Sequence, residues 1–342
     1  MKNRLTICAV ALAAVCACSK QADALQPEGS GAKASLNVSV KGSSTKAAAE
    51  TIGDEAKVGS LQVFVFKGDN LDVYGQASGT TSMTLSATVG ARTVYAVLNG
   101  PDLSGVVSKS ALEAAVSRLQ DNAADSFVMV GSQDVTLSKT SNVSVSVDRI
   151  AARLRIKKIT RKFSSAGLAS LDASKFEITR VYVADAVTDN NYAVSKTSGF
   201  TWKNSTLGGS AISTSDAFLY KAPASPVTLA QNASSSEEYV FYVYPNPATE
   251  ESASALFTRM IVECRIDGEY YTYPVIVEGG VQKNRSYEVN ELIITRYGNP
   301  SNGDNTVDPG EDDKIESFDI PFGITINEWT LVLLGDAGTI TI

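Results

Sequence analysis

Short runs in which apolar and polar residues alternate recur along most of the chain and predict a β-rich protein. Leu36, Val38 and Val40 are separated by polar residues, which is the spacing of a strand with one buried face. Residues 61–66 are apolar nearly throughout and predict a strand at the centre of a sheet. Further strands are expected at 82–88, 92–98, 127–130, 135–137, 143–147, 176–183, 239–244, 257–266, 270–277, 287–295, 324–334 and 340–342.

Two turn and helix signals refine this picture. Asp267-Gly268 separates two apolar runs and predicts a hairpin. Ser110 and Glu113 have capping-box spacing, and the apolar residues of one helical face follow them: Leu112, Ala115, Val116 and Leu119. Residues 153–157 alternate basic and apolar side chains and predict a strand with one face in water. Strands outnumber helices, at spacings that suit two β-sandwich domains with one short helix in the first.

The first residues predict export as a lipoprotein. Lys2 and Arg4 precede an apolar run at 5–15, which is too short for a membrane span of about 20 residues and is typical of a secretory signal. Cys18 follows a small residue in a lipobox pattern and is the expected lipidation site, whereas Cys16 fits the pattern less well because Val15 precedes it. The alternative is a plain signal peptide. Residues 19–34 then predict a flexible tether.

Composition excludes several kinds of chemistry. The chain contains no histidine, which removes Ser-His-Asp and Cys-His catalytic sites and histidine-ligated zinc. The net charge is −7 and no basic block is present, so nucleic acid is not an expected partner. Cys264 lies in an apolar run and is expected in the core. We expect no enzyme activity, no catalytic residue, no metal site and no cofactor.

Three weaker signals keep other ligands open. The acidic stretch 304–316 could bind calcium, but it lacks the spacing of an EF-hand, and the pattern favours a solvated acidic loop. Glu237-Glu238 and Glu250-Glu251 are adjacent pairs, whose members point to opposite faces of a strand and so make no glycosidase site by themselves. The tyrosines at 270, 271 and 273 could stack a sugar or pack across a sheet.

The two ends of the chain suggest a mechanism. The strand at 35–40 is followed by a polar loop that contains Lys46, and a trypsin-like protease cutting between Lys46 and Ala47 would remove the lipid and that strand together. The exposed groove would be a template for strand addition from another chain. The C-terminal segment could donate this strand through its apolar residues: Trp329, Leu331, Leu333, Ile340 and Ile342. The alternatives are an ordinary loop lysine and a C-terminal strand that completes its own domain.

Six segments occur in a specific order: the Cys18 lipobox, Ala34–Val40, Thr45–Ala47, Leu61–Phe66, Val147–Arg153 and Ile324–Trp329. In this order the chain resembles the major fimbrillins (FimA-like) of Bacteroidales, the subunits of type V pili. The resemblance implies two transthyretin-like β-sandwich domains, removal of the first strand by a trypsin-like protease, and polymerisation through a C-terminal donor strand. The best-known members are cut after arginine, but this chain has none between Arg4 and Arg92. Lys46 takes that place here, with Lys41 and Lys57 as rivals.

The resemblance divides the chain into a signal peptide with lipobox at 1–18, a tether at 19–34, an N-terminal domain at 35–158 and a C-terminal domain at 159–342. We expect a stalk subunit of a surface fimbrium that supports adhesion. Its expected partners are copies of itself, other pilus subunits, a trypsin-like protease and, before processing, the outer membrane through lipid on Cys18. The alternatives are an anchor or tip subunit of the same pilus and a glycan-binding surface lipoprotein.

Overall fold

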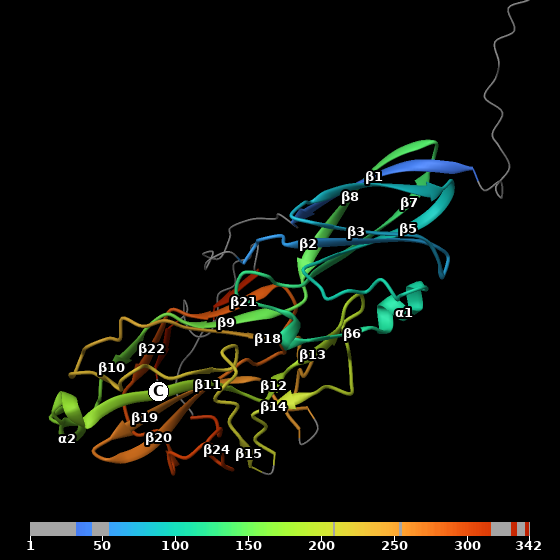
Figure 1. Cartoon of the computed structure of the whole chain (residues 1–342). Helices are drawn as coiled ribbons and strands as arrows, with labels where there is room; N and C mark the ends of the chain where they lie inside the picture. Colours follow the sequence, from blue (N-terminus) through green and yellow to red (C-terminus); the bar gives the residue numbers. More distant parts are fainter. Residues whose placement is uncertain are drawn as a thin grey trace, which may run out of the picture.

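The computed structural model describes residues 32–42, 55–207, 209–252, 255–315, 330–333 and 339–341. The predicted lipidation site Cys18, the predicted cut between Lys46 and Ala47, and the donor-strand residues Trp329 and Ile342 lie outside these residues. Figure 1 shows two lobes joined where β8 leads into β9, with most strands up to β8 in one lobe and most later strands in the other.

One curled sheet forms the N-terminal lobe. Its seven strands run in the order β3-β2-β5-β7-β8-β1-β4. Their bounds are β1 (Lys33–Gly42), β2 (Ser60–Lys67), β3 (Asn70–Ser78), β4 (Ser82–Thr88), β5 (Gly90–Leu98), β7 (Met129–Leu137) and β8 (Thr140–Arg149). The outermost strands β3 and β4 approach each other, and a Cβ at Gly75 of β3 would lie 2.5 Å from the Leu85 side chain of β4. The sheet therefore closes around its own core.

The core of this lobe contains apolar residues of the strands that the sequence predicted. Leu61, Val63 and Val65 of β2 pack with Leu36 and Val38 of β1 in one apolar cluster. The other face of β2 carries Phe64 and Phe66, which belong to a second and larger cluster that continues into the C-terminal lobe. The prediction of a central strand at 61–66 is confirmed, because β2 is buried on both faces and lies between β3 and β5.

The predicted helix is shorter than its apolar pattern suggested. α1 (Lys109–Ala114) is capped by Ser108, whose side chain accepts a hydrogen bond from the Ala111 amide, and not by Ser110. The chain then forms β6 (Val116–Arg118) and a 3₁₀ turn at Leu119–Asp121. The extension of the helix to residue 119 is wrong because β6 pairs with β13 (Asp189–Asn191), so backbone pairing with the other lobe overrides the helical pattern.

Three main sheets make up the C-terminal lobe. The first has the order β18-β9-β21-β25 and the second β10-β22-β26. Their strands are β18 (Tyr239–Val243), β9 (Ala152–Ile156), β21 (Arg285–Val289), β25 (Thr330–Leu333), β10 (Ile159–Arg161), β22 (Glu291–Ile294) and β26 (Thr339–Thr341). The third runs β16-β11-β19-β20-β23, with β17 also on β11: β16 (Tyr220–Lys221), β11 (Phe176–Ala184), β19 (Arg259–Ile266), β20 (Glu269–Ile276), β23 (Asn299–Ser301) and β17 (Val227–Thr228).

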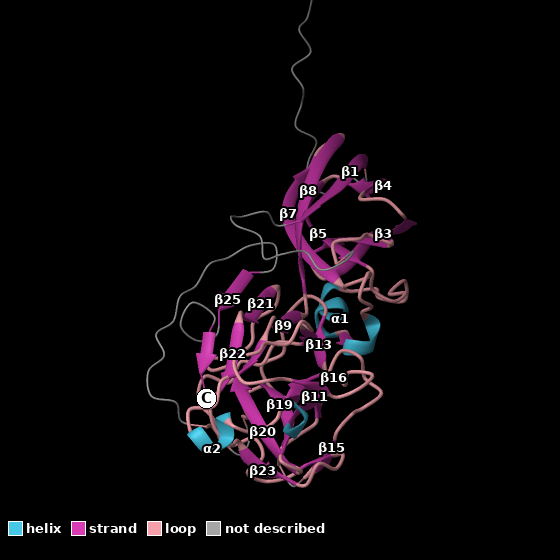
Figure 2. Ribbon diagram, turned by 90° about the vertical axis from the view of Figure 1, so that its left-hand side faces the viewer, coloured by secondary structure: helices cyan, strands magenta, loops and turns pink. Residues whose placement is uncertain are grey.

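Small elements complete this lobe. β12 (Ala186–Val187) pairs with β14 (Trp202–Lys203), and β15 (Ser210–Ala211) pairs with β24 (Thr306–Val307). The short helix α2 (Ala166–Ala169) and a 3₁₀ turn at Ala173–Lys175 lie between β10 and β11. Figure 2 shows the few helical segments against a structure made almost entirely of strands and loops. The mainly-β prediction is confirmed, with multiple sheets that fit β-sandwich domains.

Two further predictions have clear outcomes. The hairpin at Asp267-Gly268 is confirmed, since these residues have φ of 50° and 101° and join the antiparallel pair β19 and β20. Cys264 is confirmed as a buried core residue, and burial raises the pKa of its thiol well above the usual value. The domain boundary after residue 158 stays a prediction. β9, which precedes that boundary, pairs with β18 and β21 of the C-terminal lobe.

Candidate strand-exchange groove around the first strand

β1 lies inside the N-terminal sheet and is paired along both of its edges. It runs antiparallel to β4, with Leu36 opposite Leu85, and parallel to β8, with Val38 opposite Val143. The Val40 amide donates to the Thr81 carbonyl at 2.9 Å beyond the end of β4. Loss of β1 would therefore leave two unpaired strand edges facing each other, which is the geometry that accepts an added strand.

The inward side chains of β1 form part of the core. Leu36 is 0% exposed and Val38 is 1% exposed, whereas Val40 is only half-buried. The outward residue Asn37 hydrogen-bonds Asn142 of β8 and Thr84 of β4, both across the sheet. Full burial of a valine or leucine side chain stabilises a fold by about 1.5–3 kcal/mol. The residues predicted to be removed therefore hold the lobe together through apolar contacts as well as backbone pairing.

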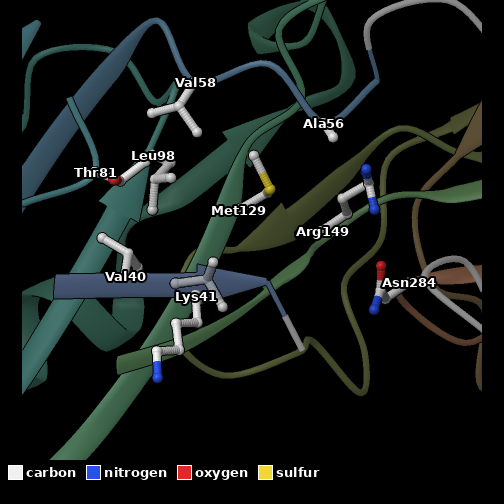
Figure 3. Close-up of a pocket in the computed structure, with 10 residues that line it drawn as sticks. Val40, Lys41, Ala56, Val58, Thr81, Leu98, Met129, Arg149 and Asn284 are labelled. Atoms are coloured by element: carbon white, nitrogen blue, oxygen red, sulfur yellow. The ribbon is translucent and has the colours of Figure 1, made fainter. Parts of the chain in front are cut away.

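A cavity of about 270 Å³ opens where β1 ends. Its apolar wall comes from Val40, Val58, Leu98, Met129 and Val147, and polar residues close the side toward the C-terminal lobe. Figure 3 shows these side chains around the space, with the ammonium of Lys41 directed away from it. The cavity is continuous with the row of side chains under β1, because Val40, Leu98 and Val147 belong to or pack against the same core cluster.

Glu55, the first described residue after β1, is tied to both lobes. Its carboxylate accepts hydrogen bonds from Arg153 Nη1 at 2.8 Å and from the Tyr242 hydroxyl at 2.5 Å. Its carbonyl oxygen accepts from Arg149 Nε and Nη2 at the end of β8, at 3.2 and 3.1 Å. The side chains of Glu55 and Arg153 are 1% and 0% exposed. Burial raises the pKa of the Tyr242 hydroxyl, and the neighbouring Glu55 charge adds to this effect.

The same ion-pair cluster continues along β9 and β21. Arg153 Nη2 lies 3.0 Å from Glu288, which also pairs with Lys157 at 2.8 Å. Burial alone would raise the pKa of Glu288, but hydrogen bonds from Lys157 and Ser286 and the charges of Lys157 and Arg153 lower it below its usual value. The charged form of this carboxylate is therefore stabilised inside the protein.

The predicted wet face of residues 153–157 is wrong for this reason. Arg153 and Arg155 are buried, and every residue of β9 is inaccessible. Arg155 pairs with Glu238 at 2.5 Å. The alternation of basic and apolar residues predicts water on one side of the strand, whereas carboxylates from other segments cover that side. Sequence reasoning missed Glu55 because its partners lie about a hundred or more residues away.

These contacts distinguish the candidate cut sites. Lys41 belongs to β1 and is opposite Ser146 of β8, so a cut there falls within a paired strand. Lys57 pairs with Asp125 at 3.0 Å on the surface, but it follows the buried Glu55 by two residues. A protease needs several residues around the cut in extended form, which the contacts of Glu55 oppose. The geometry therefore disfavours Lys41 and Lys57.

The structure brings the predicted donor strand to its own C-terminal lobe and not to the groove of β1. β25, which contains Leu331 and Leu333, pairs in parallel with β21. β26 pairs in parallel with β22, with Ile340 opposite Leu292, and Ile340 is buried. In the part of the chain that the structure describes, both strands lie at the edge of their sheets and have one neighbour each. Within the described part of the chain, these are the contacts of the predicted donor residues.

The other ligand signals have structural partners. Tyr273 is buried and donates to the Arg296 carbonyl, while Tyr271 packs on Tyr297 with ring centroids 4.7 Å apart. Asp308 accepts from Asn302. Among the described residues, no group of three or more metal-ligating side chains is placed to hold a metal ion, and no helix is long and apolar enough to cross a bilayer.

Arg259 lies among three acidic side chains. It pairs with Glu251 and lies 3.5 Å from Asp312 and 3.3 Å from Asp185. Glu238, Glu251 and Asp312 therefore form ion pairs with buried arginines, a structural use of residues that the sequence left open as ligands.

Comparisons with known proteins agree with this architecture. Residues 32–160 match the model of a family described as the major fimbrial subunit protein (FimA). A candidate cell adhesion protein from Bacteroides eggerthii has a similar fold, with a TM-score of 0.63 at 20% identity over 84% of this chain and 93% of that one. A fimbrilin from Porphyromonas gingivalis gives a TM-score of 0.56 at 15% identity over 81% and 93% of the two chains.

A second candidate cell adhesion protein, from Parabacteroides distasonis, has a TM-score of 0.53 at 18% identity over 80% of this chain and 96% of that one. None of the curated protein sequences matches this chain. At identities of 15–20%, the structural similarity to these proteins shows a shared fold. The family match agrees with the resemblance to the major fimbrillins that the sequence predicted. Residues 32–160 of this chain therefore resemble the major fimbrial subunit protein (FimA), and most of the chain shares its fold with the fimbrilin and the cell adhesion proteins named above.

Proposed function

We propose that this chain is a structural stalk subunit of a type V pilus that polymerises by strand exchange. In this proposal it is exported as an outer-membrane lipoprotein through Cys18 and is cut by a trypsin-like protease after Lys46. The C-terminal segment of one subunit then fills the groove that β1 leaves in the next. The observation that carries the proposal is the place of β1, paired on both edges yet joined to the rest of the chain through the segment that contains Lys46.

The free energy lost with β1 favours its replacement by another strand over a groove that stays empty. Removal of β1 uncovers the side chains that packed under Leu36 and Val38 and leaves the backbone groups of β4 and β8 without partners. An unpaired backbone group that is shielded from water costs free energy comparable to a lost hydrogen bond. A second strand that supplies alternate apolar side chains restores both the apolar burial and the backbone hydrogen bonds. A head-to-tail contact of this kind does not close on itself and so produces filaments.

The backbone pairing of the C-terminal strands suits the donor role. Among the described residues, β25 and β26 are short and each pairs with one strand, in parallel ladders that are slightly less stable per residue than antiparallel ones. Their release costs fewer backbone contacts than the removal of β1, which has two neighbours. A donor segment that rests on its own lobe before exchange is consistent with both features.

The first experiment is the N-terminal residue and mass of the protein taken from the cell surface. An unlipidated chain that begins at Ala47 supports the proposed cut, whereas an acylated Cys18 with β1 still attached contradicts it. A second test deletes residues 329–342. The expected product is a folded, processed monomer that does not polymerise, and normal filaments from this deletion would refute the donor-strand step.

One observation favours a second candidate, an anchor subunit that keeps its lipid. β1 pairs with β4 and β8 of its own chain along both edges, which is the arrangement of a subunit whose own first strand fills its groove. An anchor would retain β1 and accept no donor strand. Lipidated, uncut protein at the base of isolated pili supports this candidate. For both candidates we propose no enzyme activity and no nucleic-acid partner, in keeping with a family of structural subunits.

A further inference from the structure

The row of side chains under β1 ends in an unfilled position. Ala34, Leu36 and Val38 point into the core and Val40 is half-buried at its margin. Since strand side chains alternate, the next inward position is Gly42, which is opposite Val147 and has no side chain. The cavity of about 270 Å³ lies at this end of the strand, and Val147 is one of its walls. β1 therefore leaves the last place of its own groove empty.

We propose that this cavity is the first docking subsite for the strand donated by a second copy of this chain. The occupant is a large apolar side chain from residues 329–342 of that copy, where apolar residues alternate at Leu331 and Leu333. This inference rests on the strand exchange proposed above and adds the place where exchange begins. An apolar cavity of about 150 Å³ accepts a benzene molecule, so the space here admits a leucine or isoleucine side chain.

The cavity is in the right place for an exchange that follows the cut. Lys41 and Ala56 both line it, and the chain between them carries Lys46. The predicted cut therefore separates two segments of the chain that both reach the cavity. After the cut, the chain that carries β1 ends at Lys46, and Gly42 at the end of β1 lies beside an empty apolar space. An incoming strand can bury its first side chain there while the rest of β1 still covers the core.

Displacement can then proceed residue by residue along the groove. The first backbone contact to be exchanged is the one that the Val40 amide makes with the Thr81 carbonyl, because Thr81 also lines the cavity. Each further step replaces one residue of β1 with one residue of the donor. The strand edges of β4 and β8 are thus never unpaired along their whole length at once. A stepwise route avoids the barrier of emptying the groove completely.

A second copy is favoured as the occupant because the cavity continues the acceptor groove. The walls belong to the core cluster that β1 covers, so the strand that replaces β1 reaches them without a change of direction. The donor segment is also the part of the chain whose described strands have one neighbour each. Residues 47–54 of the same cleaved chain are the competing occupant, and the experiment separates the two.

The test uses the purified full-length chain, with trypsin added to start polymerisation. Light scattering gives the initial rate, and unboiled gels show the ladder of polymers. Val58→Trp and Thr81→Trp fill the cavity from two different walls. Val107→Trp adds the same side chain at a residue that is 70% exposed and does not line the cavity. Thermal unfolding of each uncut variant establishes that it folds. Because Thr81 is exposed, Thr81→Trp serves as the test if Val58→Trp does not fold.

The expected result is an initial rate at least tenfold slower for both cavity variants and unchanged for Val107→Trp. Folded cavity variants that polymerise at the wild-type rate overturn the proposal, as they would if residues 47–54 filled the space instead. A wild-type chain that is cut after Lys46 and does not polymerise contradicts strand exchange itself. The two failures are therefore distinguishable.

Discussion

Replacement of Glu55 by glutamine tests whether the segment after the proposed cut is anchored by buried charge. The substitution keeps the size and shape of the side chain and removes its negative charge. Arg153 and Tyr242 both donate hydrogen bonds to this carboxylate. The amide has one acceptor oxygen and one donor nitrogen, so it must place its NH₂ group against one of these two donors.

The expected loss in the free energy of unfolding is large. Removal of one partner from a buried ion pair costs about 3–5 kcal/mol. Arg153 retains Glu288 at 3.0 Å, which offsets part of this cost. We therefore expect Glu55→Gln to lower the free energy of unfolding by about 2–4 kcal/mol. A typical domain has only about 5–15 kcal/mol in total.

Urea unfolding of the full-length chain measures this loss, with Glu278→Gln as the matched control. Glu278 pairs with Lys314 at 2.5 Å, and both side chains are about half exposed, so its loss should cost at most about 1 kcal/mol. Limited trypsin digestion gives a second readout. We expect Glu55→Gln to expose Lys57 to cleavage, while the wild type is cut only before Glu55. Equal losses for the two variants, or a wild type cut first at Lys57, would refute the anchoring role.

Three further predictions concern the core and pH. Val38→Asp in the uncut chain should cost more than about 3 kcal/mol by urea unfolding because Val38 is buried under β1, but it should not affect trypsin-cut protein from which β1 has left. Gly131→Ala should lower the melting temperature of both forms, since its Cβ would lie 1.8 Å from the Ser146 carbonyl oxygen, and an unchanged value would argue against this close approach. Burial raises the pKa of Asp185 from 3.8 to about 6, although Arg259 opposes the shift. The folded state therefore binds this proton more tightly, and its stabilisation, at most about 3 kcal/mol, is lost as pH rises from about 4 through 6. Comparison with Asp185→Asn across this range should show that slope, and parallel curves would contradict it.

Local patterns predicted the strands and missed the buried charges. The alternation of Leu36, Val38 and Val40 predicted β1, because period-two burial is a local property of the sequence. The same rule failed at Arg153 and Arg155, where charged residues alternate with apolar ones as they do on a solvated strand. Their carboxylate partners come from β21 and from the segments before β2 and β18, and no local pattern shows which segments meet.

For the helix and the groove as well, local patterns predicted one part and contacts between distant segments decided the rest. Leu112 and Leu119 are buried as predicted, but the backbone between them leaves the helix to pair with residues 189–191. The existence of an apolar groove followed from the strand pattern, whereas its empty end at Gly42 depends on residues from six other segments. A glycine at the end of an alternating strand is the one local signal of that cavity.

Glu55 divides the start of the described chain into a removable part and a permanent part. Before it, the described residues are those of β1 and Ala32, whose backbone pairs with the N-terminal lobe alone. From Glu55 onward, the chain is tied through Arg149, Arg153 and Tyr242 to both lobes. A cut between residues 43 and 54 therefore removes a strand and leaves the ion pairs between the lobes intact, whereas a cut after Lys57 would break them. A filament of regular repeat needs the same angle between lobes in every subunit, so selection for polymerisation favours a protease site on the N-terminal side of Glu55.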